Sequence, residues 1–516
     1  MGSYIERWDV EDQDFWESTG KKIANRNLWI SIPCLLCAFA VWLYWSIITV
    51  QMRNLGFPFD TVQLFTLSAI AGLAGATFRI PNSFLIAISG GRNVIALTTG
   101  LLIAPALGVG IALQDINTPY TVFAIMAALS GFGGGNFASS MSNINFFFPK
   151  RVQGMSLGLN AGLGNVGVSV MQVLLPFVAS FGLFGALGGT GLPLASDVGG
   201  NPAGTIVYIQ NSGLVWVPIL AVLTLAAWFG MNNLAIATPK IGSTFSSLAK
   251  AFGLILIGLI GTVIGLYMLL GLGWSMWIVL PITIIATVLI MRAIPGDIKE
   301  NLNTQFAIFR NKHNWIMTYL YIMTFGSFIG YSAAFPLLIR VVFGELPDGS
   351  INPNAPNPFA FAWLGPLVGS LARPIGGWVS DKLGGARVTQ WDTVVMILAT
   401  LGVAYYVRLA SNAAQPEQFF TPFLILFLIL FITTGIGNGS TFRMVPIIFE
   451  PSEAGPVLGW TSAVAAYGAF IIPRVFGQQV NAGTPEFALY GFAIYYFTSL
   501  LLNWYYYARK NAEMPC

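Results

Sequence analysis

The sequence predicts an all-α polytopic membrane protein with two similar six-helix halves and two extra helices between them. Three observations support this fold class. The 516 residues are 55% hydrophobic and only 9% charged, whereas soluble domains carry about 25% charged residues. Apolar runs of about 20 residues recur along the chain, and in lipid such runs form helices because the backbone must satisfy its own hydrogen bonds. Several motifs of the first half return in the second.

Fourteen apolar runs are long enough to be spans, and polar segments separate them. Residues 1–27 are polar and mixed in charge, and no basic region there leads a short apolar core, so we expect no removable signal peptide. The predicted spans are 28–50, 61–88, 94–113, 119–147, 155–183, 213–236, 251–270, 274–293, 315–342, 357–380, 390–410, 419–445, 455–478 and 487–507.

Basic residues gather on one side of these predicted spans. They are Lys21, Lys22, Arg26, Arg92, Lys150, Arg151, Lys240, Lys250, Arg310, Lys312, Lys382, Arg387, Arg509 and Lys510. The opposite loops are poor in Lys and Arg, with Arg53 as the exception. Because cytoplasmic loops carry an excess of Lys and Arg, we expect a multi-pass protein of the inner (plasma) membrane with both termini in the cytoplasm.

Three sets of motifs repeat in the same order in the two halves. At one constant offset, Gly75, Arg79, Gly90 and Gly91 fall on Gly369, Arg373, Gly384 and Gly385. The stretch GFGGGNFASSM (131–141) faces GIGNGSTFRM (435–444), and Gly154, Gly158 and Gly167 fall on Gly455, Gly459 and Gly468. Parallel repeats of six spans are the plan of the major facilitator superfamily.

The repeats divide the chain into two halves with a linker between them. The predicted parts are a cytoplasmic tail (1–27), an N-terminal half (28–236), a linker with two inserted helices (237–310), a C-terminal half (311–507) and a second cytoplasmic tail (508–516). The inserted pair (251–293) is predicted to cross the membrane and return, so all later spans keep their orientation. It carries no internal polar motif. We expect it to serve helix packing or contact with a partner.

Arg79 and Arg373 are lone cations inside apolar spans. An arginine at membrane depth costs several kcal/mol unless water, a partner or a ligand compensates. If the halves pack about a pseudo-two-fold axis, the two guanidinium groups converge and form a site for an anion, and their paired donors suit a planar oxyanion. In the alternative, each arginine bonds backbone carbonyls that Pro81 and Pro374 free; the symmetry of the pair favours the anion site.

Acidic residues are missing from the middle of the predicted spans, and those nearest lie at span ends: Asp392, Glu450, Glu453 and Glu486. Proton-coupled transporters usually carry an intramembrane carboxylate or histidine, so this pattern favours anion exchange over proton symport. The three cysteines and the single histidine form no metal-ligand pattern, and no nucleophile–base pair is evident. We therefore expect no metal site, no cofactor and no enzymatic activity.

Glycine-rich stretches carry a family resemblance. Residues 130–172 and GIGNGSTFRMVPIIF (435–449) closely resemble the two signatures of the nitrate/nitrite porter (NarK/NarU) family. GGWVSDKLGGARV (376–388) resembles the loop motif of the wider superfamily, with Asp381 and Arg387 as its charged members. Matches at 15–31, 79–84 and 321–335 extend the resemblance over nearly the whole chain except 240–300.

The resemblance implies an alternating-access carrier for nitrate and nitrite. The residues that it assigns to the anion are two binding arginines, Arg79 and Arg373, a contacting amide, Asn165, a hydrogen-bonding hydroxyl, Tyr321, and two aromatic walls, Phe137 and Phe325. A flat anion between two rings, with donors at its rim, agrees with this assignment. Each ring taken alone is also consistent with core or lipid packing.

Further residues are secondary candidates. The amide of Asn136 can donate to an oxyanion, and the signature glycines Gly135, Gly162 and Gly437 are expected to allow close packing of helices that slide during gating. The family usually has twelve spans, so the inserted pair is a departure. The extra cations Arg443 and Arg474 either add to the positive field of the cavity or contact water near the cytoplasmic end.

The leading hypothesis is nitrate/nitrite exchange by rocking of the two halves, in a protein that lies in the lipid bilayer and is expected to be monomeric without a nucleic-acid partner. Nitrate–proton symport is the alternative within transport. A nitrate sensor would need an output domain, for which the tails leave little room. A channel would need a continuous pore, whereas a two-fold repeat is typical of a carrier.

Overall fold

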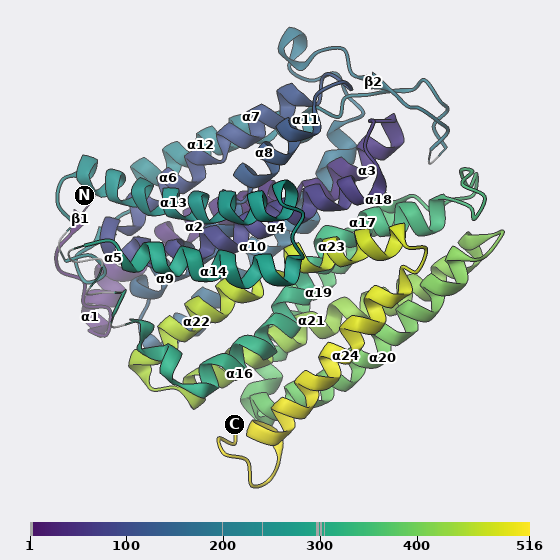
Figure 1. Cartoon of the computed structure of the whole chain (residues 1–516). Helices are drawn as coiled ribbons and strands as arrows, with labels where there is room; N and C mark the ends of the chain where they lie inside the picture. Colours follow the sequence, from purple (N-terminus) through teal and green to yellow (C-terminus); the bar gives the residue numbers. More distant parts are fainter. Residues whose placement is uncertain (1–3, 199, 240, 296–298, 300–301, 304) are drawn as a thin grey trace.

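The computed structural model describes residues 4–198, 200–239, 241–295, 299, 302–303 and 305–516. Long helices dominate it, and they form two bundles with a shorter pair lying across one side (Figure 1). Both termini lie away from the loop that carries β2 (Leu192–Pro193). Lys240 and parts of the predicted linker lie outside the described residues.

Helices α2 to α12 make up the first bundle, where the N-terminal half is predicted. They are α2 (Lys21–Leu43), α3 (Trp45–Leu55), α4 (Thr61–Asn82), α5 (Leu85–Ser89), α6 (Gly91–Leu101), α7 (Ile103–Ala112), α8 (Tyr120–Ser130), α9 (Phe132–Phe147), α10 (Lys150–Val178), α11 (Asn211–Leu214) and α12 (Trp216–Gly230). A 3-10 turn, η2 (Gly185–Gly188), and the antiparallel pair β2 with β3 (Ile206–Val207) shape the loop between α10 and α11.

The second bundle follows the inserted helices α13 (Thr244–Leu266) and α14 (Met276–Arg292), which a π-helical turn, η3 (Tyr267–Gly271), helps to join. Its elements are η4 (Phe306–Arg310), α16 (Lys312–Tyr321), η5 (Ile322–Gly326), α17 (Ser327–Gly344), α18 (Pro358–Phe361), α19 (Leu364–Leu383), α20 (Gly385–Ser411), η6 (Pro416–Phe419), α21 (Phe420–Ile448), α22 (Pro451–Ala465), α23 (Gly468–Asn481), α24 (Glu486–Asn503) and η7 (Trp504–Ala508).

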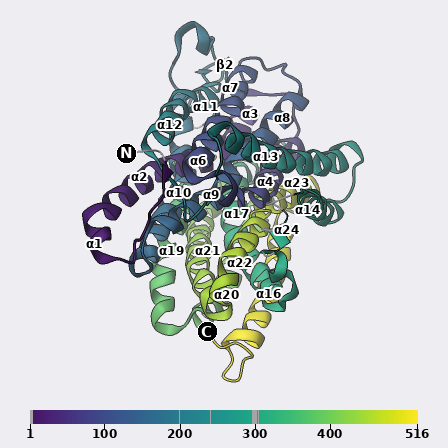
Figure 2. The same ribbon diagram turned by 90° about the vertical axis from the view of Figure 1, so that its left-hand side faces the viewer.

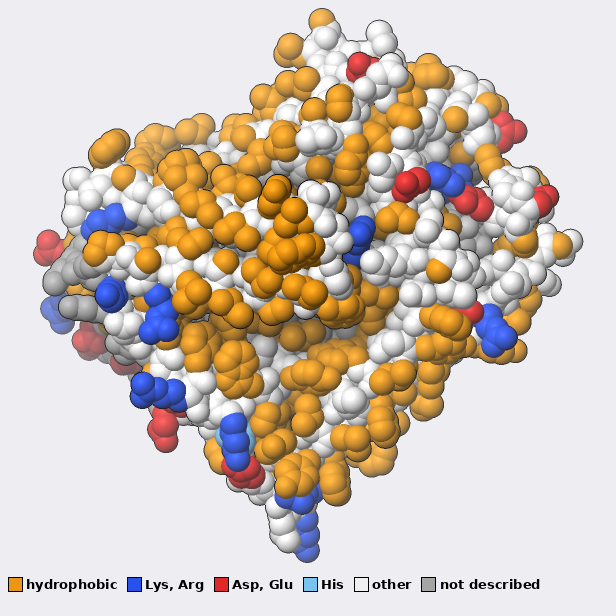
Figure 3. Space-filling model, viewed as in Figure 1, with side chains coloured by type: hydrophobic (Ala, Val, Ile, Leu, Met, Phe, Trp, Pro, Cys, Tyr) orange, Lys and Arg blue, Asp and Glu red, His pale blue; other side chains and the backbone are white. Residues whose placement is uncertain are grey.

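Eleven helices in the described part of the chain are long and apolar enough to cross a membrane. The inserted helix α14 is shorter, and α19 and α24 are not among the eleven. The all-helical membrane fold is therefore confirmed, whereas the total of fourteen spans stays a prediction. Figure 3 shows apolar side chains over most of one face, with Lys and Arg side chains along the lower-left edge.

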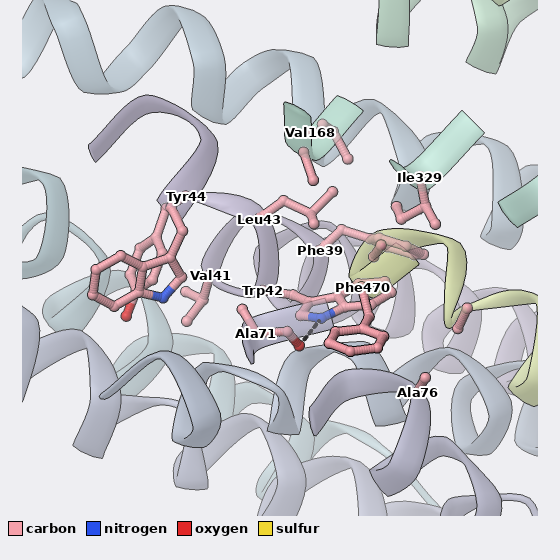
Figure 4. Packing of buried hydrophobic residues seen from close by; sticks show 14 of the residues in the cluster. Phe39, Val41, Trp42, Leu43, Tyr44, Ala71, Ala76, Val168, Ile329 and Phe470 are labelled. Carbon is pink, nitrogen blue, oxygen red and sulfur yellow. Dashed lines mark hydrogen bonds between the residues drawn. The ribbon is translucent and has the colours of Figure 1, made fainter. Parts of the chain in front are cut away.

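Helix α4 carries one of the predicted arginines, and local chemistry defines its start and its packing. Asp60 caps the helix by accepting from Gln63 N at 2.7 Å, while Gln63 Oε1 accepts from Asp60 N at 3.0 Å. Farther along, Trp42 Nε1 donates to Ala71 O at 2.7 Å (Figure 4). Gly75 permits this approach, because a Cβ there would collide with the Trp42 indole.

The two bundles meet closely where α4 crosses α23. A Cβ on Gly72 would collide with the Ala469 backbone, and Thr77 Oγ1 hydrogen-bonds Tyr467 Oη at 2.9 Å. More contacts between the bundles lie at the end opposite the termini, where Arg53 Nη2 pairs with Glu345 Oε1 at 2.8 Å. This crossing brings the helices of the predicted site together.

The inserted pair packs on α4 through small residues. A Cβ on Gly258 would lie 2.6 Å from Phe78 Cδ1, and one on Gly261 would collide with Thr287 Oγ1 and lie 3.0 Å from Thr77 Cγ2. Figure 2 shows α13 and α14 beside α4 on one side of the molecule. The predicted packing role of this pair is thus seen in its contact with the helix that carries Arg79.

The N-terminal tail is attached to the first bundle, which the sequence did not indicate. A π-helical turn, η1 (Trp16–Gly20), joins a short helix, α1 (Gln13–Phe15), to α2. Before them, β1 (Tyr4–Ile5) pairs in parallel with β4 (Asn233–Leu234). The sixth predicted span therefore ends earlier than expected, at Gly230, because residues 233–234 form a strand instead.

Candidate functional site

Arg79 lies at the centre of the site and is fully buried. Its Nε donates to Gly134 O at 2.8 Å, and its Nη1 donates to Ser462 O at 3.2 Å. Its Nη2 is buried without a hydrogen-bond partner. The alternative in which the arginine bonds backbone carbonyls is thus partly realised, because two of its three guanidinium nitrogens do so. The third nitrogen remains for a ligand. Such an unsatisfied charged donor costs at least about 1–3 kcal/mol when nothing occupies the site.

Arg373 lies on α19 and is 8% exposed. Its Nη2 donates to Tyr321 Oη at 3.4 Å, and its Nη1 is buried without a partner. Arg79 interacts electrostatically with both Tyr321 and Arg373. The structure therefore brings the two arginines and the tyrosine into one region, as the sequence predicts, and no carboxylate of the described residues forms an ion pair with either guanidinium.

Aromatic rings surround the Arg79 guanidinium. Its carbon lies 4.9 Å from the centroid of the Phe137 ring and 5.2 Å from that of Phe325. The two rings face each other with centroids 6.1 Å apart and planes at 25°. The Tyr321 ring stacks on Phe325 at 5.6 Å and 9°. The predicted aromatic pair is therefore assembled around the arginine, with its flat faces nearly parallel.

A π-helical turn places two of these rings. Tyr321 ends α16 and Phe325 lies in η5, four residues later. Glycines allow neighbouring helices to press on this turn, because a Cβ on Gly468 would collide with Gly326 O. Turns of this kind are frequent at functional sites, and the stack of the two rings follows from their spacing along the turn.

The predicted amides are buried near the site but make no hydrogen bond to the arginines among the described residues. Asn136 Oδ1 and Asn165 Oδ1 both lack hydrogen-bond partners. Asn136 precedes Phe137 on α9, and Asn165 lies on α10, which packs against α2, α9 and α19. The unused atoms are amide oxygens, which accept hydrogen bonds, so an anion would bind these two side chains only through their Nδ2 groups.

Asp392 differs from the expectation. The sequence predicts it at a span end, but α20 begins at Gly385, so Asp392 lies in the eighth position of the helix and is 8% exposed. Its Oδ2 has no hydrogen-bond partner. A Cβ on Gly437 would lie 2.8 Å from that oxygen and 2.6 Å from Thr324 Cγ2. A buried carboxylate therefore lies behind the turn that carries Phe325.

The charged members of the loop motif lie apart from the site. Asp381 accepts a hydrogen bond from Arg443 Nε, and both side chains are about half exposed. Arg443 thus pairs with an acid, as a cation in contact with water would, and Arg387 is exposed. Arg474 lies at the other end of the molecule, where its Nη1 donates to Thr66 Oγ1 at 2.6 Å. The prediction that Arg474 contacts water near the predicted cytoplasmic end, where the termini lie, is therefore wrong.

The three signature glycines have different surroundings. A Cβ on Gly135 would lie 2.6 Å from Asn82 Nδ2, and Gly437 faces Thr324 as described, so both permit close packing. At Gly162 a Cβ would meet no atom within 4 Å. Close packing is therefore not the role of Gly162 in this conformation.

The sequence did not indicate two further rings at the site. The Trp42 ring lies 5.4 Å from the Arg79 guanidinium carbon, and the Phe442 ring lies 5.0 Å from that of Arg373. Aligning GFGGGNF with GIGNGSTF, with a gap of one residue, places Phe442 opposite Phe137. Each arginine thus has a ring from its own half, and the repeat contained the signal for Phe442.

Comparisons with known proteins show the family of the chain. The chain is 40% identical over 517 residues to the probable nitrate/nitrite antiporter NarK2 of Thermus thermophilus, with 100% of this chain and 99% of that protein covered. The chain belongs to the nitrate/nitrite porter family. Within this family it is also 37% identical to the nitrate/nitrite transporter NarU of Escherichia coli, over 98% of this chain and 96% of that protein. No family model matches the chain.

The fold agrees with the family. The structure matches the crystal structure of tetrameric PepTSo2 with a TM-score of 0.55 at 12% sequence identity, covering 93% of this chain and 96% of that chain. This likeness and the relatives confirm the major facilitator fold that the repeats predict. The porter is thus a multi-pass membrane protein, and its relatives are transporters.

Proposed function

We propose that this porter exchanges nitrate and nitrite across the inner (plasma) membrane as a monomer, by alternating access, with the anion held between Arg79 and Arg373. One observation carries the proposal: each arginine keeps one buried guanidinium nitrogen without a partner. The donors on two like charges, without a carboxylate paired to either, attract an anion. The 40% identical relative, a probable nitrate/nitrite antiporter, supports the same substrates.

The rings favour a flat anion. Phe137 and Phe325 present nearly parallel faces around Arg79, and Tyr321 adds a hydroxyl beside Arg373. The ring centroids are 6.1 Å apart, so a planar oxyanion needs only a small separation of the rings to lie between their faces, while its oxygens accept from donors at the rim. A tetrahedral oxyanion, by contrast, would have to push the rings much farther apart. We assign Asn165 and Asn136 to the polar margin of this site, where their amides can turn a donor toward the anion.

We infer that the site opens toward the cytoplasm in this conformation. By the positive-inside rule, the end with both termini is cytoplasmic. The ion pair Arg53–Glu345 and the hydrogen bond from Arg340 Nε to Asn54 Oδ1 at 2.7 Å join the halves at the opposite end. Near the cytoplasmic end, a Cβ placed on Gly158 of α10 would have no neighbour within 4 Å.

Repulsion between the arginines gives a reason for exchange. Without an anion, two cations close together in a buried region oppose closure of the halves around them. An anion between them removes this repulsion, so the loaded protein can pass between its two open states and the empty protein resists the passage. Nitrate entering on one side would then be required before nitrite leaves on the other.

The test is counterflow of labelled nitrate in proteoliposomes loaded with nitrite, with and without a pH gradient. We expect uptake that requires internal nitrite and does not respond to the gradient. Substituting both Arg79 and Arg373 by alanine should abolish it. Fast uptake into vesicles without internal anion, accompanied by proton entry, would refute exchange, and normal transport by the double variant would refute the binding site.

Asp392 favours one second candidate, nitrate–proton symport. Its carboxylate is buried next to Thr324 and Gly437, and an unpartnered carboxylate in a membrane protein is a proton-binding candidate. Asp392→Asn has nearly the same size but binds no proton there. If symport operates, this variant should lose uptake driven by a pH gradient while keeping counterflow. If exchange operates, both activities should be unchanged in their pH dependence.

A further inference from the structure

A cavity of about 480 Å³ lies at the end of the molecule opposite the termini, away from the two site arginines. Its walls come from α4, α8, η3 of the inserted pair, and α23. The residues that line it are Asp60, Val62, Gln63, Thr66, Tyr120, Thr121, Ala124, Leu270, Gly271 and Arg474. It thus has one cation, one anion and an apolar wall.

Arg474 is the cation of this cavity, and its hydrogen-bonding capacity is only partly used. Nη1 donates to Thr66 Oγ1 at 2.6 Å, whereas Nε is buried without a partner. Among the described residues no carboxylate lies within ion-pair distance of it. An acceptor with negative charge, such as a phosphodiester, would use the remaining donors.

Asp60 is the anion of the cavity and lies nearer the surface. It caps α4, while Thr66, which binds Arg474, is six residues farther along the helix. A rise of about 1.5 Å per residue puts Thr66 about 9 Å deeper than Asp60. Tyr120 joins the two levels through α4, because its Oη donates to the backbone oxygen of Gln63 at 3.0 Å, and Gln63 lies between Asp60 and Thr66 in the sequence. Negative charge therefore lies outermost, with positive charge beneath it.

The cavity lies at the depth of lipid headgroups. Beside its wall residues Leu270 and Gly271, three large aromatic side chains of the inserted pair are strongly exposed: Tyr267 (63%), Trp274 (44%) and Trp277 (62%). Exposed Trp and Tyr near the end of a membrane helix mark the boundary between lipid and water. A lipid in the adjacent leaflet could therefore place its headgroup in the cavity.

We propose that this cavity binds the headgroup of a phospholipid that carries both a phosphodiester and a primary ammonium, phosphatidylethanolamine. Arg474 binds the phosphate, Asp60 binds the ammonium above it, and the apolar wall contacts the start of the acyl chains. Because negative charge lies outermost in the cavity, the site favours this lipid over an anionic one. Asp60 would repel a headgroup that has only negative charge. A free anion such as nitrate would meet the same repulsion and leave most of the cavity unfilled.

This proposal gives the inserted pair a second role, since η3 builds one wall. Bound lipid would tie the pair and α4 of the first half to α23 of the second at the outer surface. The proposal stands apart from nitrate binding, because neither Arg79 nor Arg373 lines the cavity.

The experiment is native mass spectrometry of the full chain in detergent, titrated with phosphatidylethanolamine, phosphatidylcholine or phosphatidylglycerol. The variants are Arg474→Gln and Asp60→Asn. Asparagine keeps the helix cap, and glutamine keeps a donor for Thr66. The matched control is Arg408→Gln, at an exposed arginine in the last turn of α20. Melting temperatures of all variants establish that they are folded.

We expect the wild type and the control to retain phosphatidylethanolamine best, and each cavity variant to weaken it about tenfold or more. Equal or tighter binding of phosphatidylglycerol, or unchanged lipid binding by both cavity variants, would overturn the proposal. Displacement of the lipid by millimolar inorganic phosphate or nitrate would overturn it in favour of a free-anion site. Loss of nitrate counterflow by Arg79 variants with lipid binding intact would separate the two sites.

Discussion

Replacing Arg79 by lysine keeps the positive charge at the site but removes the guanidinium geometry. Arg79 donates to Gly134 O and Ser462 O, and it keeps Nη2 for the anion. A lysine ammonium is a single centre at the end of a flexible chain and cannot reach all three acceptors. The two bonds to backbone carbonyls form without an anion, so their loss lowers the stability of the protein, whereas the loss of the bond from Nη2 weakens binding of the anion.

A hydrogen bond from a charged donor contributes about 1.5–3 kcal/mol, and the bond to the anion in the buried site is assigned the upper value of about 3 kcal/mol. That loss corresponds to a decrease of about a hundredfold in kcat/KM for nitrate counterflow. The control is Arg408→Lys, the same type of substitution at an exposed position of α20. It should keep the wild-type kcat/KM.

The assay is counterflow of labelled nitrate in proteoliposomes, with equal protein incorporation and melting temperatures well above the assay temperature as preconditions. If Arg79→Lys keeps kcat/KM within about threefold of the wild type, charge alone suffices, and the argument from paired donors fails.

Three more outcomes follow from other contacts. Phe442→Ala should raise the KM for nitrate about tenfold, because it removes the ring 5.0 Å from the second arginine, a contact worth about 1–2 kcal/mol when desolvated; Phe442→Tyr should restore binding. Gly75→Val should lower the melting temperature strongly, because a Cβ there would collide with an indole ring of α2, whereas Gly253→Val, with no neighbour within 4 Å, should not. The hydrogen bond from Lys312 lowers the pKa of the Glu513 carboxyl from 4.5, so the protection factor of the C-terminal tail amides (the intrinsic exchange rate at each pH divided by the observed rate) should stay constant above pH 4.5 and decrease only as the pH falls through the lowered pKa; Glu513→Gln should remove this dependence.

Each of these outcomes has a result that contradicts it. Unchanged nitrate KM in Phe442→Ala would mean that the ring does not orient the arginine. Equal melting temperatures for the two glycine variants would mean that the α2–α4 contact is not tight in the membrane. A decrease in the tail protection factor that begins at a pH well above the ordinary carboxyl pKa would mean that the carboxyl is not held in its charged form by the lysine.

The arginine pair was predictable because the repeat showed each residue twice in the same place. Composition and apolar runs indicate the helical membrane fold, and the family resemblance assigned Tyr321, Phe137 and Phe325, which the structure gathers around the arginines. The arginines were found for a different reason than the rings: similar motifs in two halves of one fold occupy related positions about its axis.

Other features could not be read from the sequence because they depend on distant contacts or exact helix ends. The pairing of Tyr4 with Asn233 joins residues far apart in the chain and leaves no local pattern. Asp392 falls at a predicted span end because hydropathy marks the apolar core of a helix, while α20 extends to Gly385, after Gly384 with a φ of 90°. The Arg474 side chain bonds Thr66 of α4, a helix of the other half, and such a contact leaves no pattern in the sequence around Arg474.

The attachment of α13 and α14 makes the two halves mechanically unequal. The pair packs on α4, α5 and α6, all of which belong to the first bundle, so its main contacts in the described part of the chain are with that bundle. Lipid must flow around a wider perimeter when the first bundle tilts than when the second one does. Viscous drag from the bilayer should therefore hold the first bundle comparatively still, and most of the rocking in the membrane frame should be performed by the narrower second bundle.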